Sequence, residues 1–483
     1  MFQDKAFRNY FFISVGIYSF LLVFSWLAFF NASNDPATIY QPLRSFLIPL
    51  AFAEDMPSWL LAIKGFKPES SLKLINEAFT WVFVLSQIGL FIYAYKKKFS
   101  FNQIQFASIY IAILAVFLIP SDSSDLFGYI ARGAQQVFEG QNPYAETVAM
   151  IEGWQSNPYF ANTLWENNPA PYGPLFMILC KLLVQFSFGS FWLCLLLFKL
   201  FNAAVFILFG FFLREFIEES DYKNKESLFL IYALNPLITV ESIWNCHNDL
   251  LMGVLVFLGI FYAMRKEFNL SFLVIVWSAL IKYVSVVLLP FIVLYAMFDP
   301  KKVFKIRISN FPLYGLLIGG TFVQFFVYHF LASDKFQSGD IKGNLFLSHK
   351  SLFDVFNSLH RYAFNADLPS YFKYIFLGAF AFVCLAVVNK IFRMKSKIEK
   401  EDMLKYSFWL LFILISLIAS KFHSWYIIMY LVLGIFVHPF LMLLLSSSHM
   451  LSLTFLDQAN IANFMVMTAL PILYYFKIHK EQR

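Results

Sequence analysis

Charged residues are scarce in this sequence. Only 14% of the 483 residues are charged, whereas 59% are hydrophobic; a soluble domain carries about 25% charged residues. A soluble fold of this size could not cover so much apolar surface, because its outer shell must face water. The shortage of charge also excludes a disordered chain and a nucleic-acid-binding domain. The sequence therefore predicts a protein that crosses a lipid bilayer many times and has no nucleic-acid partner.

Cysteine is scarce as well. The chain has four cysteines, and no two of them form a Cys-x-x-Cys pair. This spacing indicates neither a disulfide framework nor a cysteine zinc site. We expect no cofactor, with one alternative: Asp125, His247 and Asp249 could converge as oxygen and nitrogen ligands of a divalent metal.

Long apolar runs dominate the rest of the chain. A membrane-spanning helix needs about 20 apolar residues, and the runs predict an all-α polytopic fold with about 12–14 such helices in one membrane domain, residues 1–483. The interval 270–298 holds either one span or two short ones broken at Pro290. The other predicted spans are 11–30, 78–95, 104–120, 189–213, 228–244, 248–264, 312–331, 371–391, 406–420, 425–438, 440–456 and 460–476.

Basic residues gather in certain loops, and this pattern predicts the orientation. Lysine and arginine accumulate on the cytoplasmic side of membrane proteins, so the net charge of +7 indicates cytoplasmic anchoring and not an anionic partner. Loops 31–77, 121–171 and 333–370 then face the opposite side. The basic clusters include Lys96, Lys97 and Lys98; Arg265 and Lys266; Lys301, Lys302, Lys305 and Arg307; and Lys390, Arg393, Lys395, Lys397, Lys400 and Lys405.

Loop 121–171 is the most unusual of the outer loops. It carries six acidic residues, one arginine and no lysine. A loop this long is uncommon unless it is functional. The following stretch, 172–188, is short for a span and contains Lys181 and Gln185; we predict a helix lying in the outer interface. Residues 121–188 thus form a predicted outer loop with short interfacial helices, and 333–370 a second outer loop.

Four polar clusters fall on the predicted outer face. An aspartate that emerges from a membrane helix can act as a general base for an alcohol, and a cation at that depth can hold a lipid-linked phosphate. Aromatic rings beside polar groups suit a sugar face or the membrane interface. The clusters are Asp122, Asp125, Tyr129, Arg132, Asn142, Tyr144 and Tyr172; Asn235, Glu241, His247, Asn248 and Asp249; Lys282 and Tyr283; and Lys421, His423, Trp425 and Tyr426.

Each cluster also has a purely structural interpretation. Asp122 and Asp125 could cap the helix that begins near Leu126, and residues 247–249 could cap the span that follows them. Lys282 could extend its ammonium group to an interface. The pair Trp425 and Tyr426 fits an ordinary aromatic belt.

Several motifs together resemble a known family. These are Asp125-x-x-x-Tyr129 with Arg132, Gly140-Gln-Asn-Pro-Tyr144, Tyr172-Gly-Pro174, the run from Asn235 to Asp249, Lys282-Tyr283 and Lys421-Phe-His-Ser-Trp-Tyr426. In this order the chain resembles the GT-C superfamily of integral-membrane glycosyltransferases. Within it, the sequence is similar to the bacterial polyprenyl-phosphomannose-dependent α-mannosyltransferases.

The resemblance implies that a hexose, mannose in these enzymes, moves from polyprenyl phosphate to a periplasmic glycan or glycolipid with inversion, at an inner-membrane active site. The family's catalytic acid on the first large outer loop corresponds best to Asp125, with Asp122 in reserve. Here that loop follows the third predicted span, whereas the superfamily's usual plan places it after the first. Candidate ligands of the donor phosphate are Arg132, Lys282, His247, Lys421 and His423. Candidate sugar or acceptor ligands are Tyr129, Asn142, Tyr144, Tyr172, Asn248, Asp249, Trp425 and Tyr426.

Two other functions remain open from the sequence. A transporter or flippase of a lipid-linked glycan would also need an outer-face site, although transporters commonly show internal repeats, and we find no convincing repeat. A GT-C transferase that modifies lipid A or protein would share the same fold.

Overall fold

The structure is a computed structural model of the 483-residue chain. The structural description covers residues 2–31, 68–120, 123–297, 352–369, 371–394, 399–419, 422–453 and 464–481. Asp122, Lys421, the predicted span 312–331 and most of loop 31–77 lie outside these ranges.

Helices make up the fold, and no strand occurs in the described ranges. Three described segments are long and apolar enough to cross a membrane, namely Lys5–Val23, Phe191–Glu219 and Lys225–Trp244. Their helical conformation satisfies the backbone hydrogen bonds within the segment, as a bilayer requires, and their apolar side chains suit lipid. The prediction of an all-α polytopic membrane protein is confirmed.

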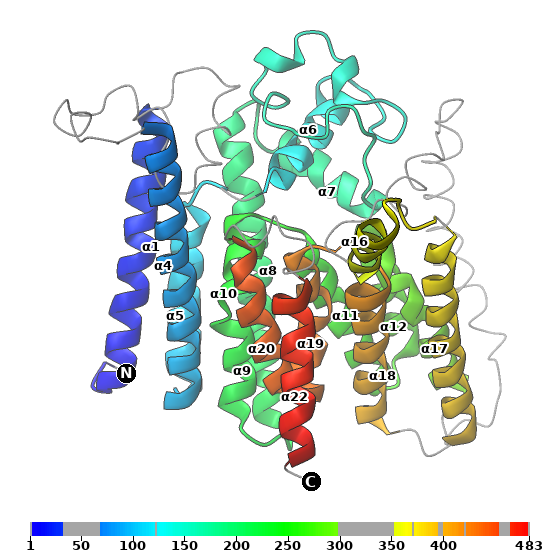
Figure 1. The fold of residues 1–483 in the computed structure, drawn as a ribbon. Coiled ribbons are helices and arrows are strands. Elements are labelled where there is room, and N and C mark those ends of the chain that lie inside the picture. Colours follow the sequence, from blue (N-terminus) through cyan, green and yellow to red (C-terminus); the bar gives the residue numbers. More distant parts are fainter. Residues whose placement is uncertain are drawn as a thin grey trace.

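The N-terminal helices form one side of the molecule (Figure 1). They are α1 (Lys5–Asn31), α4 (Pro68–Lys97) and α5 (Phe101–Val116). Aromatic rings join them; Phe7 meets Phe99 edge to face at 5.4 Å between centroids. Ser100 and Gln103 form a capping box that starts α5, a device that satisfies the first free backbone N–H groups of a helix.

The central and C-terminal helices run side by side in the bundle (Figure 1). Gly253 permits close packing between two of them, because a Cβ atom there would lie 2.9 Å from the carbonyl oxygen of Ile428. The helices are α8 (Phe191–Glu219), α9 (Lys225–Ala233), α10 (Pro236–Ile238), η5 (Thr239–Trp244), α11 (Asp249–Met264), α12 (Phe268–Ile281), η6 (Tyr283–Leu288), α13 (Leu289–Met297), α16 (Leu352–Phe364), α17 (Phe372–Met394), α18 (Lys400–Ile413), η10 (Leu414–Ile418), η11 (Ser424–Ile427), α19 (Ile428–Val437), α20 (Pro439–His449), η12 (Met450–Leu453), η14 (Met465–Ala469) and α22 (Leu470–Glu481).

The acidic loop folds into a compact unit at one end of this bundle (Figure 1). It contains α6 (Asp125–Val137), η3 (Val148–Met150), η4 (Trp154–Ser156) and α7 (Pro174–Gln185). The first turn of α1 and the last turn of α22 lie at the opposite end. With 12 residues, α7 is roughly 18 Å long and cannot cross a bilayer core of about 30 Å. This excludes a full crossing by residues 172–188.

Gly173 joins the acidic-loop unit to the bundle. Its N–H donates to the carbonyl of Ile281 at 3.0 Å, at the end of α12. A Cβ atom on Gly173 would lie 2.0 Å from the carbonyl oxygen of Leu280. Only a residue without a side chain permits this approach. Steric exclusion therefore explains why the Tyr172-Gly-Pro174 motif contains glycine.

The interval 270–298 is broken, but not at Pro290. The break falls at Lys282, whose backbone is extended (φ −150°, ψ 124°) between α12 and η6. Beyond it, η6 continues directly into α13, and Pro290 is the second residue of α13. A proline within the first turn of a helix is tolerated because its missing N–H would be unbonded there anyway. The predicted position of the break was therefore wrong.

The second predicted outer loop, 333–370, falls largely outside the described ranges. Its last part forms α16 and a short turn after it. Arg361 and Asp367 form an exposed ion pair across this turn. The division of the chain into a membrane domain with two outer loops stays a prediction.

Candidate active site

The site begins at the first residue of α6, directly above the bundle. Ser124 occupies the N-cap position of α6, but its side chain makes no capping hydrogen bond. Instead, the N–H of Asp125 donates to Ser123 Oγ at 3.1 Å. Ser123 therefore takes the capping role that the sequence offered to the aspartates. The Asp125 side chain is 20% exposed, so it combines a fixed position with access from outside.

A π-helix and a tight turn present the second group of residues. The π-helix η5 contains Glu241 and is followed by the turn 245–248. One-turn π-helices are rare and occur frequently at functional sites. The His247 N–H donates to the Glu241 carbonyl at 2.8 Å, which folds the turn back onto η5. This geometry brings the side chains of both residues to the same place.

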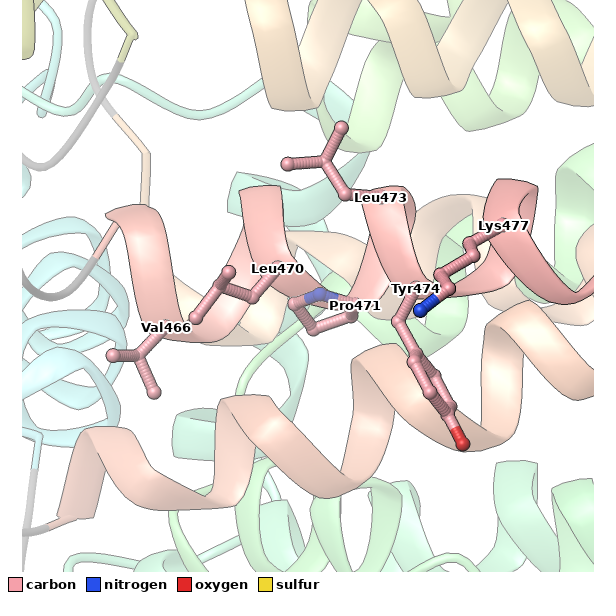
Figure 2. Close-up of a pocket in the computed structure, with 6 residues that line it drawn as sticks. All are labelled: Val466, Leu470, Pro471, Leu473, Tyr474 and Lys477. Atoms are coloured by element: carbon pink, nitrogen blue, oxygen red, sulfur yellow. The ribbon is translucent and has the colours of Figure 1, made fainter.

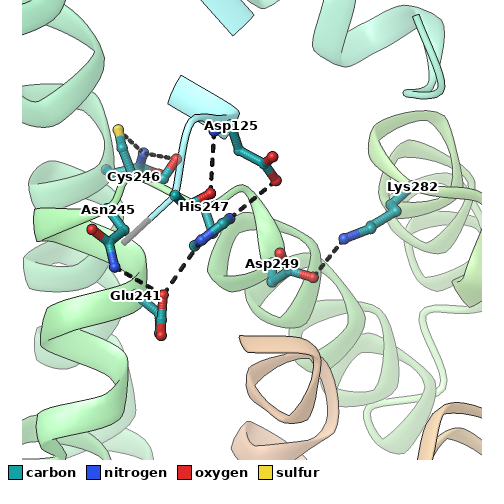
Figure 3. A network of polar contacts seen from close by, with 9 residues as sticks. Asp125, Glu241, Asn245, Cys246, His247, Asp249 and Lys282 are labelled. Atoms are coloured by element: carbon teal, nitrogen blue, oxygen red, sulfur yellow. Dashed lines mark hydrogen bonds and ion pairs between the residues drawn. The ribbon is translucent and has the colours of Figure 1, made fainter. Parts of the chain in front are cut away.

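Two carboxylates flank the imidazole of His247 (Figure 3). Its Nδ1 lies 3.4 Å from Asp125 Oδ2, and its Nε2 lies 3.4 Å from Glu241 Oε2. Asn245 Nδ2 also donates to Glu241 Oε2, at 3.1 Å. Burial lowers the pKa of His247, but the contacts with Asp125 and Glu241 outweigh it and raise the pKa to about 9. The ring is therefore an imidazolium at neutral pH, held between two carboxylates.

Trp425 stacks with two histidine rings. The His247 ring stacks on one indole at 4.0 Å with an interplanar angle of 13°, and the His423 ring stacks on the same indole at 4.3 Å and 10°. A cation over the face of an indole is attracted by the ring's quadrupole. The aromatic pair that the sequence allowed as a membrane belt thus belongs to the same site as the Asp125 carboxylate.

Lys282 and Asp249 form the other side of the site. Lys282 Nζ lies 2.7 Å from Asp249 Oδ1, and Asp249 is fully buried. The ammonium also lies 4.3 Å from the centre of the Tyr426 ring. Figure 3 shows Lys282 and Asp249 facing each other beside the His247 network. Because 17% of the Lys282 side chain remains exposed, the ammonium can still approach a ligand.

Aromatic residues of the acidic-loop unit line the site. The Tyr129 ring meets Tyr172 at 5.1 Å and Phe176 at 4.8 Å, both edge to face. The Tyr144 hydroxyl donates to the Tyr172 carbonyl at 2.8 Å. Burial, followed by the neighbouring tyrosine and aspartate charges, raises the pKa of Tyr129. The phenol is therefore neutral, and its hydroxyl is hydrogen-bonded to the Tyr172 side chain.

Arg132 and Asn142 lie further along the same unit. The Arg132 guanidinium is buried and donates to Gln135 Oε1 at 3.1 Å, to the Trp165 carbonyl at 3.0 Å and to the Asn168 carbonyl. Burial lowers its pKa to about 10, which still leaves it charged. Asn142 Oδ1 accepts from the Tyr144 N–H at 3.1 Å. Both side chains organise the loop in this structure.

Asn248 behaves differently from a helix cap. It occupies the N-cap position of α11, yet its side chain makes no capping hydrogen bond. The whole residue is buried, and neither polar atom of its amide has a hydrogen-bond partner. The capping interpretation of Asn248 was therefore wrong. An unpaired buried amide is costly, so Asn248 has the capacity to bind a polar ligand.

Three further residues, which were not predicted as site candidates from the sequence, also support the site. Glu241 was part of a noted cluster but was not chosen, because nothing in the sequence indicated that a π-helix would aim it at His247. Lys199 and Asn202 lie in the long apolar run of α8. Their side chains donate to backbone carbonyls of residues 243–246, where η5 ends and the turn 245–248 begins. A lysine within a membrane span was the one available signal.

The described residues offer no obvious metal centre. No group of three or more histidine, cysteine, aspartate or glutamate side chains within those ranges is arranged to hold an ion. The alternative of a metal at Asp125, His247 and Asp249 stays a prediction; in this structure His247 forms ion pairs with Asp125 and Glu241.

A pocket elsewhere on the surface has a different character (Figure 2). It runs along η14 and α22, and apart from one lysine its lining lacks acidic or basic groups. Its lining residues are Val466, Leu470, Pro471, Leu473, Tyr474 and Lys477. Such an apolar helix face suits contact with lipid and provides no group for acid–base chemistry.

Part of the chain is similar to known mannosyltransferases. Residues 75–298 match the family model described as alpha-(1->6)-mannopyranosyltransferase, N-terminal domain. This part of the chain resembles the bacterial membrane mannosyltransferases. It includes Asp125, His247 and Lys282, but not the cluster of His423 and Trp425.

A curated relative gives the same indication. The chain is 24% identical over 233 residues to alpha-(1->6)-mannopyranosyltransferase A of Corynebacterium glutamicum. The aligned part covers 45% of this chain and 46% of that protein, so the chain spans about half the length of the relative it matches. No solved structure matches the chain.

Proposed function

We propose that this chain is a glycosyltransferase that moves mannose from polyprenyl phosphate to a glycan or glycolipid acceptor. The observation that carries the proposal is the position of Asp125. It is the exposed end of a series of ion pairs that runs from Glu241 through His247 to Asp125. The matches to mannopyranosyltransferases over the segment that contains these residues support the choice of sugar.

The reaction requires one displacement. Asp125 takes the proton of an acceptor hydroxyl, and the acceptor oxygen forms a bond to the anomeric carbon. The bond from this carbon to the donor phosphate breaks on the opposite face, so the configuration inverts, and polyprenyl phosphate leaves with the bonding electrons. General-base assistance contributes about 10²–10⁴-fold to such a step. The ion pair with His247, at 3.4 Å, holds the Asp125 side chain in position.

Cations near the leaving phosphate stabilise its developing charge. Lys282 and His423 are the best placed of the predicted phosphate ligands, because Lys282 contacts the ring of Tyr426 and His423 the ring of Trp425, both within the site. We assign Arg132 to bracing the loop, since its guanidinium already donates to three acceptors.

We propose that the sugars contact Tyr129, Tyr172 and Asn248. Asn142 and Tyr144 shape the loop beneath these residues, and Asp249 orients Lys282.

The proposed setting is a cytoplasmic membrane with the site on the periplasmic side. The helices support this orientation, because Arg265 and Lys266 follow α11, which starts at the site and runs away from it. Residue Gln155 in the acidic-loop unit is exposed. With Cys384 replaced by serine, Gln155→Cys should react with a membrane-impermeant thiol reagent in intact spheroplasts. Labelling only after lysis would overturn the proposed orientation.

The test of the activity uses purified protein in vesicles with polyprenyl-phosphate-[¹⁴C]mannose and an acceptor lipid extract. We expect Asp125→Asn to lower the rate of transfer by about 10²-fold or more. Asp221→Asn is the control, because Asp221 is exposed in the turn between α8 and α9, and it should transfer at the parent's rate. Unchanged transfer by Asp125→Asn would exclude Asp125 as the base. Movement of an intact lipid-linked glycan across the vesicle without release of polyprenyl phosphate would favour a flippase.

A further inference from the structure

Lys199 is a buried lysine within a membrane helix. It is 2% exposed and lies in α8, the longest apolar helix among the spans described. A charged side chain in a membrane span is unfavourable and marks a functional site by default. In the part of the chain that the structure describes, its ammonium is paired with backbone carbonyls and not with a carboxylate. The proposed transfer step does not use it.

Lys199 binds the last two carbonyl groups of η5, the π-helix below the site. Its Nζ donates to the Ile243 carbonyl at 3.1 Å and to the Trp244 carbonyl at 2.7 Å. The last carbonyls of a helix carry partial negative charge and lack partners within the helix. A cation at this position therefore fixes where η5 ends and the turn 245–248 begins.

Asn202 holds the next residue of the same turn. One helical turn after Lys199, its Nδ2 donates to the Cys246 carbonyl at 3.3 Å and contacts Cys246 Sγ at 2.7 Å. Cys246 has a φ of +66°, a left-handed conformation that residues with a side chain rarely adopt. Such a conformation persists only where surrounding contacts determine it, and it is concentrated at active sites. Lys199 and Asn202 supply these contacts.

The strained residue directly precedes His247. A left-handed residue reverses the chain, and His247 then points between Asp125 and Glu241, with its ring stacked on Trp425. If the backbone at Cys246 relaxed to an ordinary conformation, the imidazole would leave these partners.

We propose that Lys199 and Asn202 are positioning residues, which clamp the backbone of residues 243–246, the end of η5 and the start of the turn, so that His247 is held between Asp125 and Glu241. They act through the backbone and touch neither the substrate nor the reacting atoms. The proposal rests on the function proposed above, but its test needs no donor or acceptor.

Trp425 provides the readout. A protonated imidazole in contact with an indole quenches its fluorescence, so loss of the His247 proton should raise the Trp425 emission. The full-length parent carries His423→Gln, because His423 also stacks on this indole. The signal is the emission of this parent minus that of the same protein with Trp425→Phe, followed between about pH 5 and pH 10. Besides Asp125 and Glu241, Asp249 also faces His247, and all variants retain these three carboxylates.

In the parent the emission should rise with a midpoint near pH 9, the pKa of His247. In Lys199→Met the midpoint should fall by at least about one pH unit towards the ordinary histidine value of about 6.5, because the imidazole is no longer held between carboxylates. Asn202→Ala should shift it in the same direction by less. Tyr232→Phe is the matched control: it removes a buried hydrogen bond from a side chain to a carbonyl of α8, that of Phe206, and should keep the parent's midpoint.

A folded Lys199→Met protein with the parent's midpoint and quenching amplitude would overturn the proposal. If Lys199→Met does not fold, Asn202→Ala decides alone, because alanine is well suited to a helix; a parent-like midpoint in that variant overturns the proposal as well. If mannosyl transfer is observed, Lys199→Met should lower kcat while the donor KM changes less than about twofold. Failure to find transfer would refute the proposed function and leave the titration to decide the clamp.

Discussion

His247 is the residue on which the other site residues depend. It contacts acidic side chains from two separate parts of the chain and one aromatic ring from a third. The charge of this imidazole is set by its neighbours, because burial alone would drive it towards the neutral form. A site built in this way is sensitive to the loss of either carboxylate.

The first prediction concerns Glu241 and the pH dependence of transfer. Because Asp125 needs the imidazolium beside it, activity should fall as pH rises through about 9, where His247 loses its proton. Glu241→Gln removes one of the two charges that raise this pKa. The alkaline limb of kcat/KM should therefore move to lower pH by about one unit or more. A pH–rate profile of both proteins measures this shift.

Exposed Glu152→Gln in the acidic loop is the control for this experiment. It changes the net charge by the same amount and should leave the alkaline limb unchanged. Coincident limbs for the parent and Glu241→Gln would contradict the role given to Glu241.

The second prediction concerns the ion pair of Asp249 and Lys282. Replacing Lys282 with methionine leaves a buried carboxylate without its cation, and this typically costs about 3–5 kcal/mol of stability. Changing Asp249 to asparagine at the same time removes that uncompensated charge. The double variant should therefore have a higher Tm than Lys282→Met alone. Thermal unfolding in detergent measures the four proteins of this cycle.

An exposed ion pair serves for comparison. Arg214 and Glu218 lie one turn apart on the surface of α8, and breaking such a pair changes stability by roughly 0.3–0.5 kcal/mol. Arg214→Met should thus have little effect on Tm. A Lys282→Met protein as stable as Arg214→Met would show that Asp249 has another partner.

At the scale of elements, the glycine that joins α7 to α12 gives the third prediction. Gly173→Ala would place a Cβ atom 2.0 Å from the Leu280 carbonyl oxygen, so the acidic-loop unit must move away from the bundle. We expect a lower Tm and faster proteolysis within residues 139–170. Limited proteolysis with identification of the fragments measures the second effect.

Gly128→Ala is the matched control for this change. Gly128 lies in α6 of the same unit, and a Cβ atom there meets Thr163 Oγ1 at 3.8 Å, an ordinary contact. Alanine also favours a helix over glycine by about 1 kcal/mol. Gly128→Ala should thus be as stable as the parent or more stable; equal proteolysis of the two variants would contradict the steric argument.

Sequence patterns predicted the elements better than their junctions. Long apolar runs gave the helices because a bilayer demands about 20 such residues in succession. The break at Lys282 was assigned to Pro290 instead, because proline is a strong local signal while an extended lysine depends on its distant partner Asp249. The same holds for Glu241 and for the clamp at Cys246. Their roles come from contacts between segments that are far apart in sequence, and no local pattern encodes those contacts.

The convergence of the four polar clusters could be anticipated only as a shared side of the membrane. Positive charge at one side and acids at the other placed Asp125, His247, Lys282 and Trp425 at the same level. Their distances within that level depend on how the helices pack, which includes close approaches such as that of Gly253 to Ile428. That these residues lie together was therefore predictable from the sequence, whereas their mutual geometry was not; the side of the membrane stays a prediction.

At the scale of the whole molecule, His247 ties the acidic-loop unit to the bundle, and this gives the last prediction. Its pKa is about 9 in the folded protein against an ordinary value of 6.5. A raised pKa contributes stability that is fully present below about pH 6.5 and is lost as pH rises through about 9. With about 1.4 kcal/mol for each pKa unit, the loss is of the order of 3 kcal/mol. The Tm in detergent should fall over this pH range.

Other groups titrate over the same range, so the useful quantity is the difference between the parent and His247→Gln. Glutamine keeps a polar side chain but cannot carry the charge, and its Tm should be lower than the parent's at pH 6 and approach it above about pH 9. Because the ion pair joins α6 to the turn before α11, the acidic-loop unit should separate first, and its proteolysis in the parent should accelerate with the same midpoint. Tm curves that stay parallel for the two proteins across this range would show that the imidazolium does not hold the unit on the bundle.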